Sequence, residues 1–139
     1  MVNVEYILDT DHVIWMVNND KDIQAKIETI GPEKIAISAI TLAEMEVPLA
    51  KKGTEKYRRQ IAFLEKNFRI LPFKAYKEYG ILRASLEEKG KRLDDMDMLI
   101  AATALQQGAT LVTNNEKHFG RIKELKSINL KKDQNGNRQ

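Results

Sequence analysis

The chain has 139 residues, of which 42% are hydrophobic and 31% are charged, and its net charge at pH 7 is +3. This length and composition predict one globular domain, and the mild positive charge permits nucleic-acid binding without requiring it. Cysteine is absent, which excludes disulfide frameworks, thiolate zinc sites and thiol nucleophiles and fits a cytoplasmic protein.

Apolar runs in the sequence are short. No run approaches the roughly 20 residues that a membrane-spanning helix needs. Asp9 and Asp11 interrupt the first apolar stretch, so we expect no signal peptide and no membrane association. The phosphate-binding motifs GxxxxGK[ST] and GxGxxG do not occur, which argues against the common nucleotide-binding folds.

Strand and helix signals alternate along the chain. The first half predicts, in order, a strand at Val4–Leu8, helices at Val13–Val17 and Asp20–Ile30, a strand at Ile35–Ser38, a helix at Ala39–Lys52 closed by Gly53, a helix capped by Thr54 and reaching about Phe68, and a strand at Arg69–Leu71. The second half predicts a helix from about Ala75 to Gly90, a helix from Asp94 or Asp95 to Gly108, a strand at Thr110–Thr113, one or two helical turns within Glu116–Lys126, and a strand at Ser127–Leu130.

This alternation predicts an α/β fold in which helices cover both faces of a parallel sheet. We expect one domain over residues 1–130 and a polar, disordered tail over residues 131–139. In parallel sheets of this kind, the ligand site lies beyond the carboxyl ends of the strands.

Four polar residues fall at that expected edge of the sheet: Asp9, Glu44, Asp97 and Asn115. Burying a carboxylate costs several kcal/mol unless it is paired or binds a metal. Three acids gathered at strand ends therefore predict a site for a hard cation such as magnesium.

Each acid also has a plainer interpretation. Asp9 can serve as a turn or helix-capping residue, although Asp11 is the better placed of the two to cap the helix that follows. Asp97 can complement a helix dipole, as Asp94 and Asp95 can, but helical spacing places Asp97 on the inward face together with Ile100, Ala101 and Ala104.

Glu44 can close a capping box with Thr41. If Ser38 is the true cap, Glu44 lies beyond the first turn, on the face of Ile40, Ala43 and Val47, which we expect to point inward. Pro48 cannot donate a hydrogen bond to the Glu44 carbonyl, so the helix is expected to be distorted there.

The remaining charged groups carry weaker signals. Nothing spaces the two histidines, His12 and His118, as metal ligands, and we interpret both as ordinary surface or core residues. The basic stretches are interpreted first as solvated helix ends and second as a path for phosphates. They are Lys51–Lys52, Lys56, Arg58–Arg59, Lys89 and Lys91–Arg92.

Three stretches, YILDTDHVIW, ISAITLAEM and DDMDMLIAATALQQGATLVTNNEKHF, resemble the PIN-domain ribonucleases, and in particular the VapC-type toxins of toxin–antitoxin pairs. The resemblance spans residues from about 4 to 130. It implies a three-layer α/β/α sandwich around a parallel sheet and an endoribonuclease dependent on Mg²⁺ or Mn²⁺, whose products carry a 5′-phosphate and a 3′-hydroxyl. It also implies an RNA substrate, a cognate antitoxin and a homodimer.

The same resemblance assigns the site residues. Asp9, Glu44 and Asp97 match the metal-binding acids, and Thr113 matches a hydroxyl that helps to hold the site. Asn115 falls where many relatives carry Asp, which removes one charge and puts a second metal ion in doubt. Cleavage of a phosphodiester by water fits these residues, because carboxylates can hold an ion that activates the water.

Two rival functions remain open at this point. A phosphatase of the haloacid-dehalogenase type would use Asp9 as nucleophile and Asp11 as acid and base, although the later acids lack the expected context. A catalytically inactive binding module with the same fold is the other rival.

Overall fold

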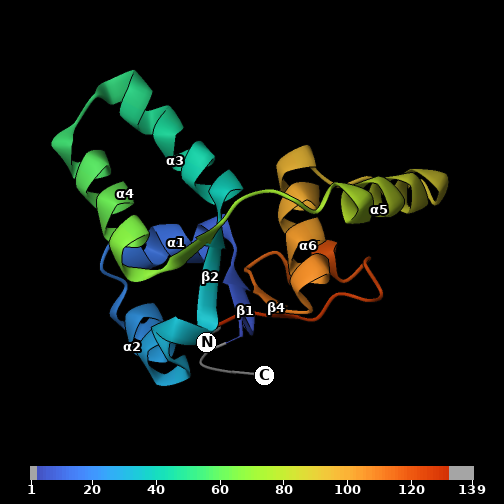
Figure 1. The fold of residues 1–139 in the computed structure, drawn as a ribbon, viewed down its shortest axis with the longest axis horizontal. Helices are drawn as coiled ribbons and strands as arrows, with labels where there is room; N and C mark the ends of the chain where they lie inside the picture. The colour runs from blue at the N-terminus through green and yellow to red at the C-terminus, as the bar shows by residue number, and fades with distance from the viewer. Residues whose placement is uncertain (1–2, 132–139) are drawn as a thin grey trace.

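A five-stranded sheet forms the centre of the computed structural model, which describes residues 3–131 (Figure 1). The strands lie in the order β3-β2-β1-β4-β5, and every neighbouring pair is parallel. The predicted parallel α/β sheet is therefore confirmed. The strands are β1 (Tyr6–Leu8), β2 (Ile35–Ser38), β3 (Arg69–Leu71), β4 (Thr110–Val112) and β5 (Ser127–Ile128).

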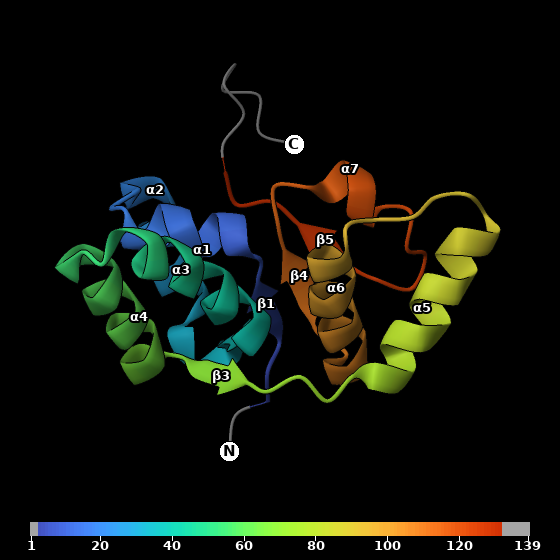
Figure 2. The ribbon, with the colours of Figure 1, turned by 90° about the horizontal axis from the view of Figure 1, so that it is seen from above.

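Helices cover both faces of this sheet, so the chain forms the predicted three-layer sandwich (Figure 2). Helices from the first half of the chain lie on one side of the strands, and those from the second half lie on the other. The first group is α1 (Thr10–Val17), α2 (Lys21–Ile30), the short 3₁₀ helix η1 (Pro32–Lys34), α3 (Ala39–Lys52) and α4 (Glu55–Asn67). The second group is α5 (Tyr76–Glu88), α6 (Asp95–Gln107) and α7 (Glu116–Phe119).

The two hydrophobic cores follow from the alternation of side chains along each strand. Ile7 and Leu111 face the core that contains α5 and α6, whereas Leu8 and Val112 face the core that contains α1 to α4. A strand covered on both faces needs apolar residues at successive positions. This requirement explains why β1, β2 and β4 read as continuous apolar runs.

The register of the strands brings their carboxyl ends to one level. Leu8 pairs with Ile37 on one side and with Val112 on the other. The next residue, Asp9, still donates its backbone N–H to the Val112 carbonyl over 2.8 Å. The residues that follow β1, β2 and β4 therefore emerge side by side at one edge.

Helix caps fix how the chain turns at this edge. The prediction that Asp11 caps α1 was wrong, because the helix begins at Thr10 rather than near Val13. Asp9 is therefore the capping residue, and Asp11 lies within the first turn. Ser38 caps α3 by accepting the backbone N–H of Ile40 at 3.0 Å, and Asp94 caps α6 in the same way. Glu44 therefore lies beyond the first turn of α3.

Several element boundaries differ from the predictions by one to three residues, as expected where strands end and helices fray. Two strands are shorter than their apolar runs: the central strand β1 begins at Tyr6, and the edge strand β5 ends at Ile128. Thr54 precedes α4 without making a side-chain cap. The helix α3 continues through Pro48 to Lys52, so the proline does not break it.

The predicted tail over residues 131–139 lies outside the described residues, except for Lys131, which binds Asp20 and lies over the ring of Trp15. Over residues 3–131, every helix is too short or too polar to traverse a lipid bilayer.

Candidate active site

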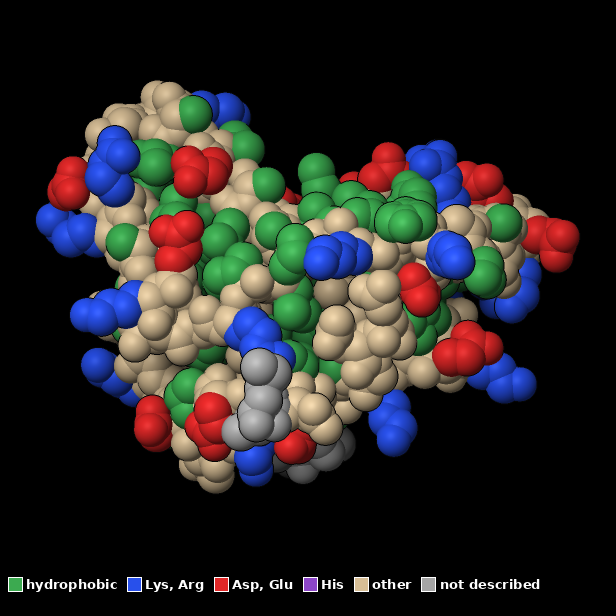
Figure 3. All heavy atoms as spheres, in the orientation of Figure 1, with side chains coloured by type: hydrophobic (Ala, Val, Ile, Leu, Met, Phe, Trp, Pro, Cys, Tyr) green, Lys and Arg blue, Asp and Glu red, His purple; other side chains and the backbone are tan. Residues whose placement is uncertain are grey.

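An open pocket of about 300 Å³ lies at the carboxyl edge of the sheet. The molecule is hollowed between the lobe of α3 and α4 and the part built from α5 and α6, while basic side chains are scattered over the face that Figure 3 shows. The lining of the pocket is almost entirely polar and contains all four residues that the sequence placed at this edge. It consists of Asp9, Thr10, Asp11, Glu44, Asp97, Asn114 and Asn115.

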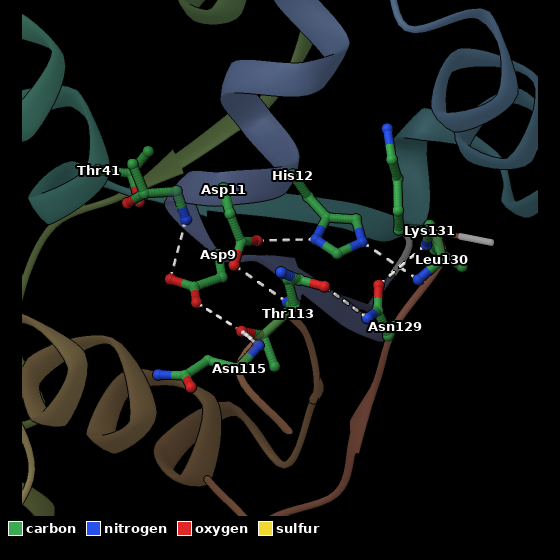
Figure 4. Close-up of polar contacts among 11 residues, drawn as sticks. Asp9, Asp11, His12, Thr41, Thr113, Asn115, Asn129, Leu130 and Lys131 are labelled. Carbon is green, nitrogen blue, oxygen red and sulfur yellow. Dashed lines mark hydrogen bonds and ion pairs between the residues drawn. The ribbon is translucent and has the colours of Figure 1, made fainter. Parts of the chain in front are cut away.

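Asp9 lies at the floor of this pocket, where its side chain is only 5% exposed. One carboxylate oxygen accepts the backbone N–H of Thr10 at 2.9 Å, and the other accepts the hydroxyl of the fully buried Thr113 at 2.6 Å (Figure 4). Both oxygens are thereby held in one orientation while their remaining lone pairs can accept further contacts.

Glu44 reaches the pocket from the second turn of α3. Its Oε1 accepts the hydroxyl of Thr10 at 2.6 Å, and Thr10 in turn lies 3.0 Å from the hydroxyl of Thr41. The expectation that Glu44 shares an inward face with Ala43 and Val47 was wrong, because both of those residues are exposed. Glu44 borders the open pocket and not the hydrophobic core. Neighbouring residues on the same face of α3 can therefore remain exposed to solvent.

Asp97 enters from the first turn of α6, as predicted, with Ile100, Ala101 and Ala104 buried beneath it. Its pKa is raised from 3.8 to about 6. Partial burial is the main cause, and the negative charge of Asp9 is the next largest. The charges of Asp94 and Glu44 act in the same direction.

The pocket concentrates negative charge without compensation from the protein. Burial raises the pKa of Asp9 too, and the nearby charges of Asp11 and Glu44 add to this effect against the hydrogen bond from Thr113, which lowers it. Among residues 3–131, no lysine, arginine or histidine forms an ion pair with Asp9, Glu44 or Asp97. Carboxylates that repel one another in this way favour the binding of a cation.

Asn115 closes the pocket on the side of β4. Its backbone N–H donates to the Thr113 hydroxyl at 3.0 Å, and the same hydroxyl donates to Asp9. Thr113 therefore connects the turn after β4 to the acid after β1. Its predicted place beside the site agrees with this geometry.

The oxygen ligands of the pocket suit an ion that keeps several of its waters better than an ion enclosed by protein side chains. Across residues 3–131, no three acidic or histidine side chains lie close enough together to enclose one ion. Mg²⁺, however, is usually bound through one or two carboxylates and keeps several of its waters. The pocket fits an ion held in that way, by oxygen ligands and water, rather than one caged by protein atoms.

Thr10 and Asn114 line the pocket, and the sequence did not point to either of them. Asp11 also lines the pocket, but the sequence suggested it only as a helix cap or as the acid and base of a phosphatase. Asp11 accepts from His12 with one oxygen and from the backbone N–H of Asn114 with the other. These contacts hold the Asp11 carboxylate in one orientation, between α1 and the turn that follows β4. Asp94 caps α6 outside the pocket, and His118 is exposed.

Comparison with known proteins agrees with this architecture. The model of the PIN domain family matches residues 6–125. A curated relative from Rickettsia felis, Ribonuclease VapC2, is 37% identical over 130 residues, which cover 86% of this chain and 93% of the relative.

Two solved structures are similar throughout. One is VapBC2 from Rickettsia felis bound to a DNA fragment from its promoter, with a TM-score of 0.82 and 35% identity over 91% of this chain and 98% of that chain. The other is DNA-bound VapBC from Salmonella typhimurium, with a TM-score of 0.79 and 28% identity over 92% of this chain and 99% of that chain.

Proposed function

Because the chain belongs to the PIN-domain family, and within it to the VapC ribonucleases, we propose that it is an endoribonuclease that hydrolyses RNA phosphodiester bonds as the toxin of a toxin–antitoxin pair. The single observation that carries this proposal is the convergence of Asp9, Glu44 and Asp97, from three distant parts of the sequence, on one pocket. None of the basic side chains within residues 3–131 forms an ion pair with these three acids. Such a pocket attracts a divalent cation and, through it, the phosphates of RNA.

Asp9 and Asp97 are proposed to hold a Mg²⁺ or Mn²⁺ ion, with Glu44 binding it directly or through a water. Such an ion, when bound, supplies positive charge to the scissile phosphate and a water that is more readily ionised. Thr113 keeps the Asp9 carboxylate in a fixed orientation, since it donates to one oxygen while Thr10 donates to the other. The expected products are a 5′-phosphate and a 3′-hydroxyl.

Asn115 is proposed to orient a water beside the reacting phosphate. An amide can donate and accept hydrogen bonds, but it carries no charge to balance a second cation. We therefore propose that one divalent ion suffices for this chain. Thr10 already donates to one oxygen of Glu44. Glu44 would therefore help to position the water as well as to bind the ion.

The proposed biological unit follows from the family. We propose that residues 1–130 form a single domain that acts on RNA in the cytoplasm, that the protein forms a homodimer, and that a cognate antitoxin silences it. Solved relatives of this chain are VapBC assemblies, which supports the proposed antitoxin.

The decisive experiment is RNA cleavage by the purified protein and by its Asp9→Asn variant in the presence of Mg²⁺. The variant keeps the size of the side chain and one acceptor for Thr113 but loses the charge, so cleavage should be abolished while the circular dichroism spectrum stays unchanged. Asp22→Asn, which removes an acid in a surface ion pair on α2, is the matched control and should cleave like the wild type. Undiminished cleavage by Asp9→Asn would contradict the proposed site.

A further inference from the structure

A fully buried histidine, His12, lies beside the acidic pocket, and the proposed chemistry makes no use of it. It occupies the first turn of α1, with its ring packed edge-on against Trp15. Both ring nitrogens have partners, as Figure 4 shows: Nδ1 lies 2.8 Å from an oxygen of Asp11, and Nε2 lies 3.1 Å from the backbone nitrogen of Leu130.

These two partners determine the protonation of the ring. The backbone N–H of Leu130 can only donate, so Nε2 must accept and carries no proton. A neutral imidazole then has its proton on Nδ1, where the Asp11 carboxylate can accept it. His12 is therefore held as the neutral tautomer that is protonated on Nδ1.

Asp11 transmits this constraint to the turn that follows β4. Its second oxygen accepts the backbone N–H of Asn114 at 3.0 Å. Asn114 lies between Thr113, which donates to Asp9, and Asn115, which borders the pocket. Fixing the backbone of Asn114 thus fixes the approach of both neighbours to the proposed metal site.

The end of the sheet closes these contacts into a ring. The Asn129 side chain donates to the Asn114 side chain at 2.8 Å, and the next residue, Leu130, donates to His12. Lys26 also donates to the Leu130 carbonyl at 2.6 Å, which prevents this segment from moving away from the ring. Three segments distant in sequence are thereby held together through one imidazole.

We propose that His12 is a positioning residue of the nuclease, which holds Asp11 and, through it, the 113–115 turn in the geometry that cleavage requires. This inference rests on the proposed function. Because His12 is fully buried, it does not contact RNA. We assign its influence on the turn to its contact with Asp11 rather than to its contact with Leu130. An Asp11 carboxylate without its His12 donor can rotate away and leave the Asn114 N–H without an acceptor.

Two substitutions distinguish the contact of His12 with Asp11 from its contact with Leu130. His12→Gln places an amide oxygen near the position of Nε2, so it can accept from Leu130 but offers Asp11 no donor. His12→Asn places an amide nitrogen near the position of Nδ1, so it can donate to Asp11 but leaves Leu130 without an acceptor. If His12 acts through Asp11, the two variants differ in catalysis although both lose one hydrogen bond.

We expect His12→Gln to lower kcat for RNA cleavage at least about tenfold, the usual consequence of losing one hydrogen bond to a charged group, and to leave KM for RNA within about twofold. His12→Asn should retain kcat within about threefold, because its remaining contact is the one that matters. A thermal melt of each variant verifies that it is folded at the temperature of the assay. Should His12→Gln not fold, Asp11→Asn, which also loses an acceptor in the ring, should show the same fall in kcat.

The tautomer provides a test that does not depend on activity. In ¹⁵N NMR of the wild-type protein, Nδ1 of His12 should appear protonated and Nε2 unprotonated, and the reverse assignment would overturn the inference. A folded His12→Gln variant with wild-type kcat, beside an active wild-type enzyme, would overturn it as well. A wild-type protein that cleaves no RNA would instead refute the proposed function, and the catalytic role of His12 with it.

Discussion

Asp97→Asn should make the metal-free protein more stable while it abolishes cleavage. In the folded protein the pKa of Asp97 is raised from 3.8 to about 6 by burial and by the charges of Asp9, Asp94 and Glu44. Its ionised form is therefore disfavoured by folding. Replacing it with a neutral isostere removes this cost, at the expense of the proposed metal ligand.

The magnitude follows from the linkage between proton binding and folding. For a fully buried group, a rise of this size corresponds to about 3 kcal/mol at neutral pH. Because Asp97 is only half-buried, solvent screens the repulsion, and we expect a gain of about 1–2 kcal/mol.

The dependence on pH has a definite sign. Between pH 3.8 and about 6 the folded state holds more protons at Asp97 than the unfolded state does. The contribution of Asp97 to stability therefore falls as the pH rises through this window, and the advantage of Asp97→Asn grows. Below pH 3.8 the residue is mostly protonated in both states, so the difference should vanish.

Urea unfolding with EDTA at several pH values between 3.5 and 7.5 measures this difference. Glu65→Gln, which removes an exposed acid of α4, is the control for the change in net charge. Adding Mg²⁺ should stabilise the wild type and leave Asp97→Asn unaffected. A variant less stable than wild type in EDTA at pH 7.5, or an advantage that does not change with pH, would refute the reasoning.

Three further substitutions have definite expected outcomes. Thr113→Val leaves an oxygen of Asp9 without its donor, so unfolding in urea should show a loss of about 1–3 kcal/mol, and kcat for RNA cleavage should fall; unchanged values for both would contradict the role of Thr113. Asn115→Asp adds a fifth acid to the lining of the pocket, so calorimetry should show tighter Mn²⁺ binding and melting in EDTA a lower Tm; weaker Mn²⁺ binding would count against a site at this edge. Pro48→Ala restores an N–H that can donate to the Glu44 carbonyl within α3, and a gain of about 1–3 kcal/mol in urea unfolding is expected, with RNA cleavage retained; unchanged or reduced stability would contradict the expectation that the proline destabilises this helix.

The sequence contained most of the fold because its apolar periodicity agrees with its turn residues. The glycines after α3 and α6 end these helices in the left-handed conformation, with φ of 62° at Gly53 and 63° at Gly108. Continuous apolar runs at β1 and β4 predicted strands covered on both faces, and the structure confirms them. The pattern cannot show where an apolar run stops pairing, so three strands have an end that differs from its predicted position by one or two residues.

The acids that line the pocket could be predicted from the sequence, whereas the hydrogen-bond partners that hold these acids in place could not. Carboxylates at strand ends stand out because burial is costly there, and the pocket contains Asp9, Glu44 and Asp97. The hydroxyl of Thr10 and the ring around His12 depend on contacts between residues up to 118 positions apart. Local sequence carries no signal for such contacts, so the partners of Asp11 and His12 could not be predicted.

The division of the helices between the two faces of the sheet has a mechanical consequence. Asp9 and Glu44 belong to the half of the chain that builds one layer, whereas Asp97 and Asn115 belong to the half that builds the other. The chain passes between these halves only once, through the short segment 72–75 that joins β3 to α5. A cation bound between these residues would link the two halves of the chain, and its loss would weaken the contact between them.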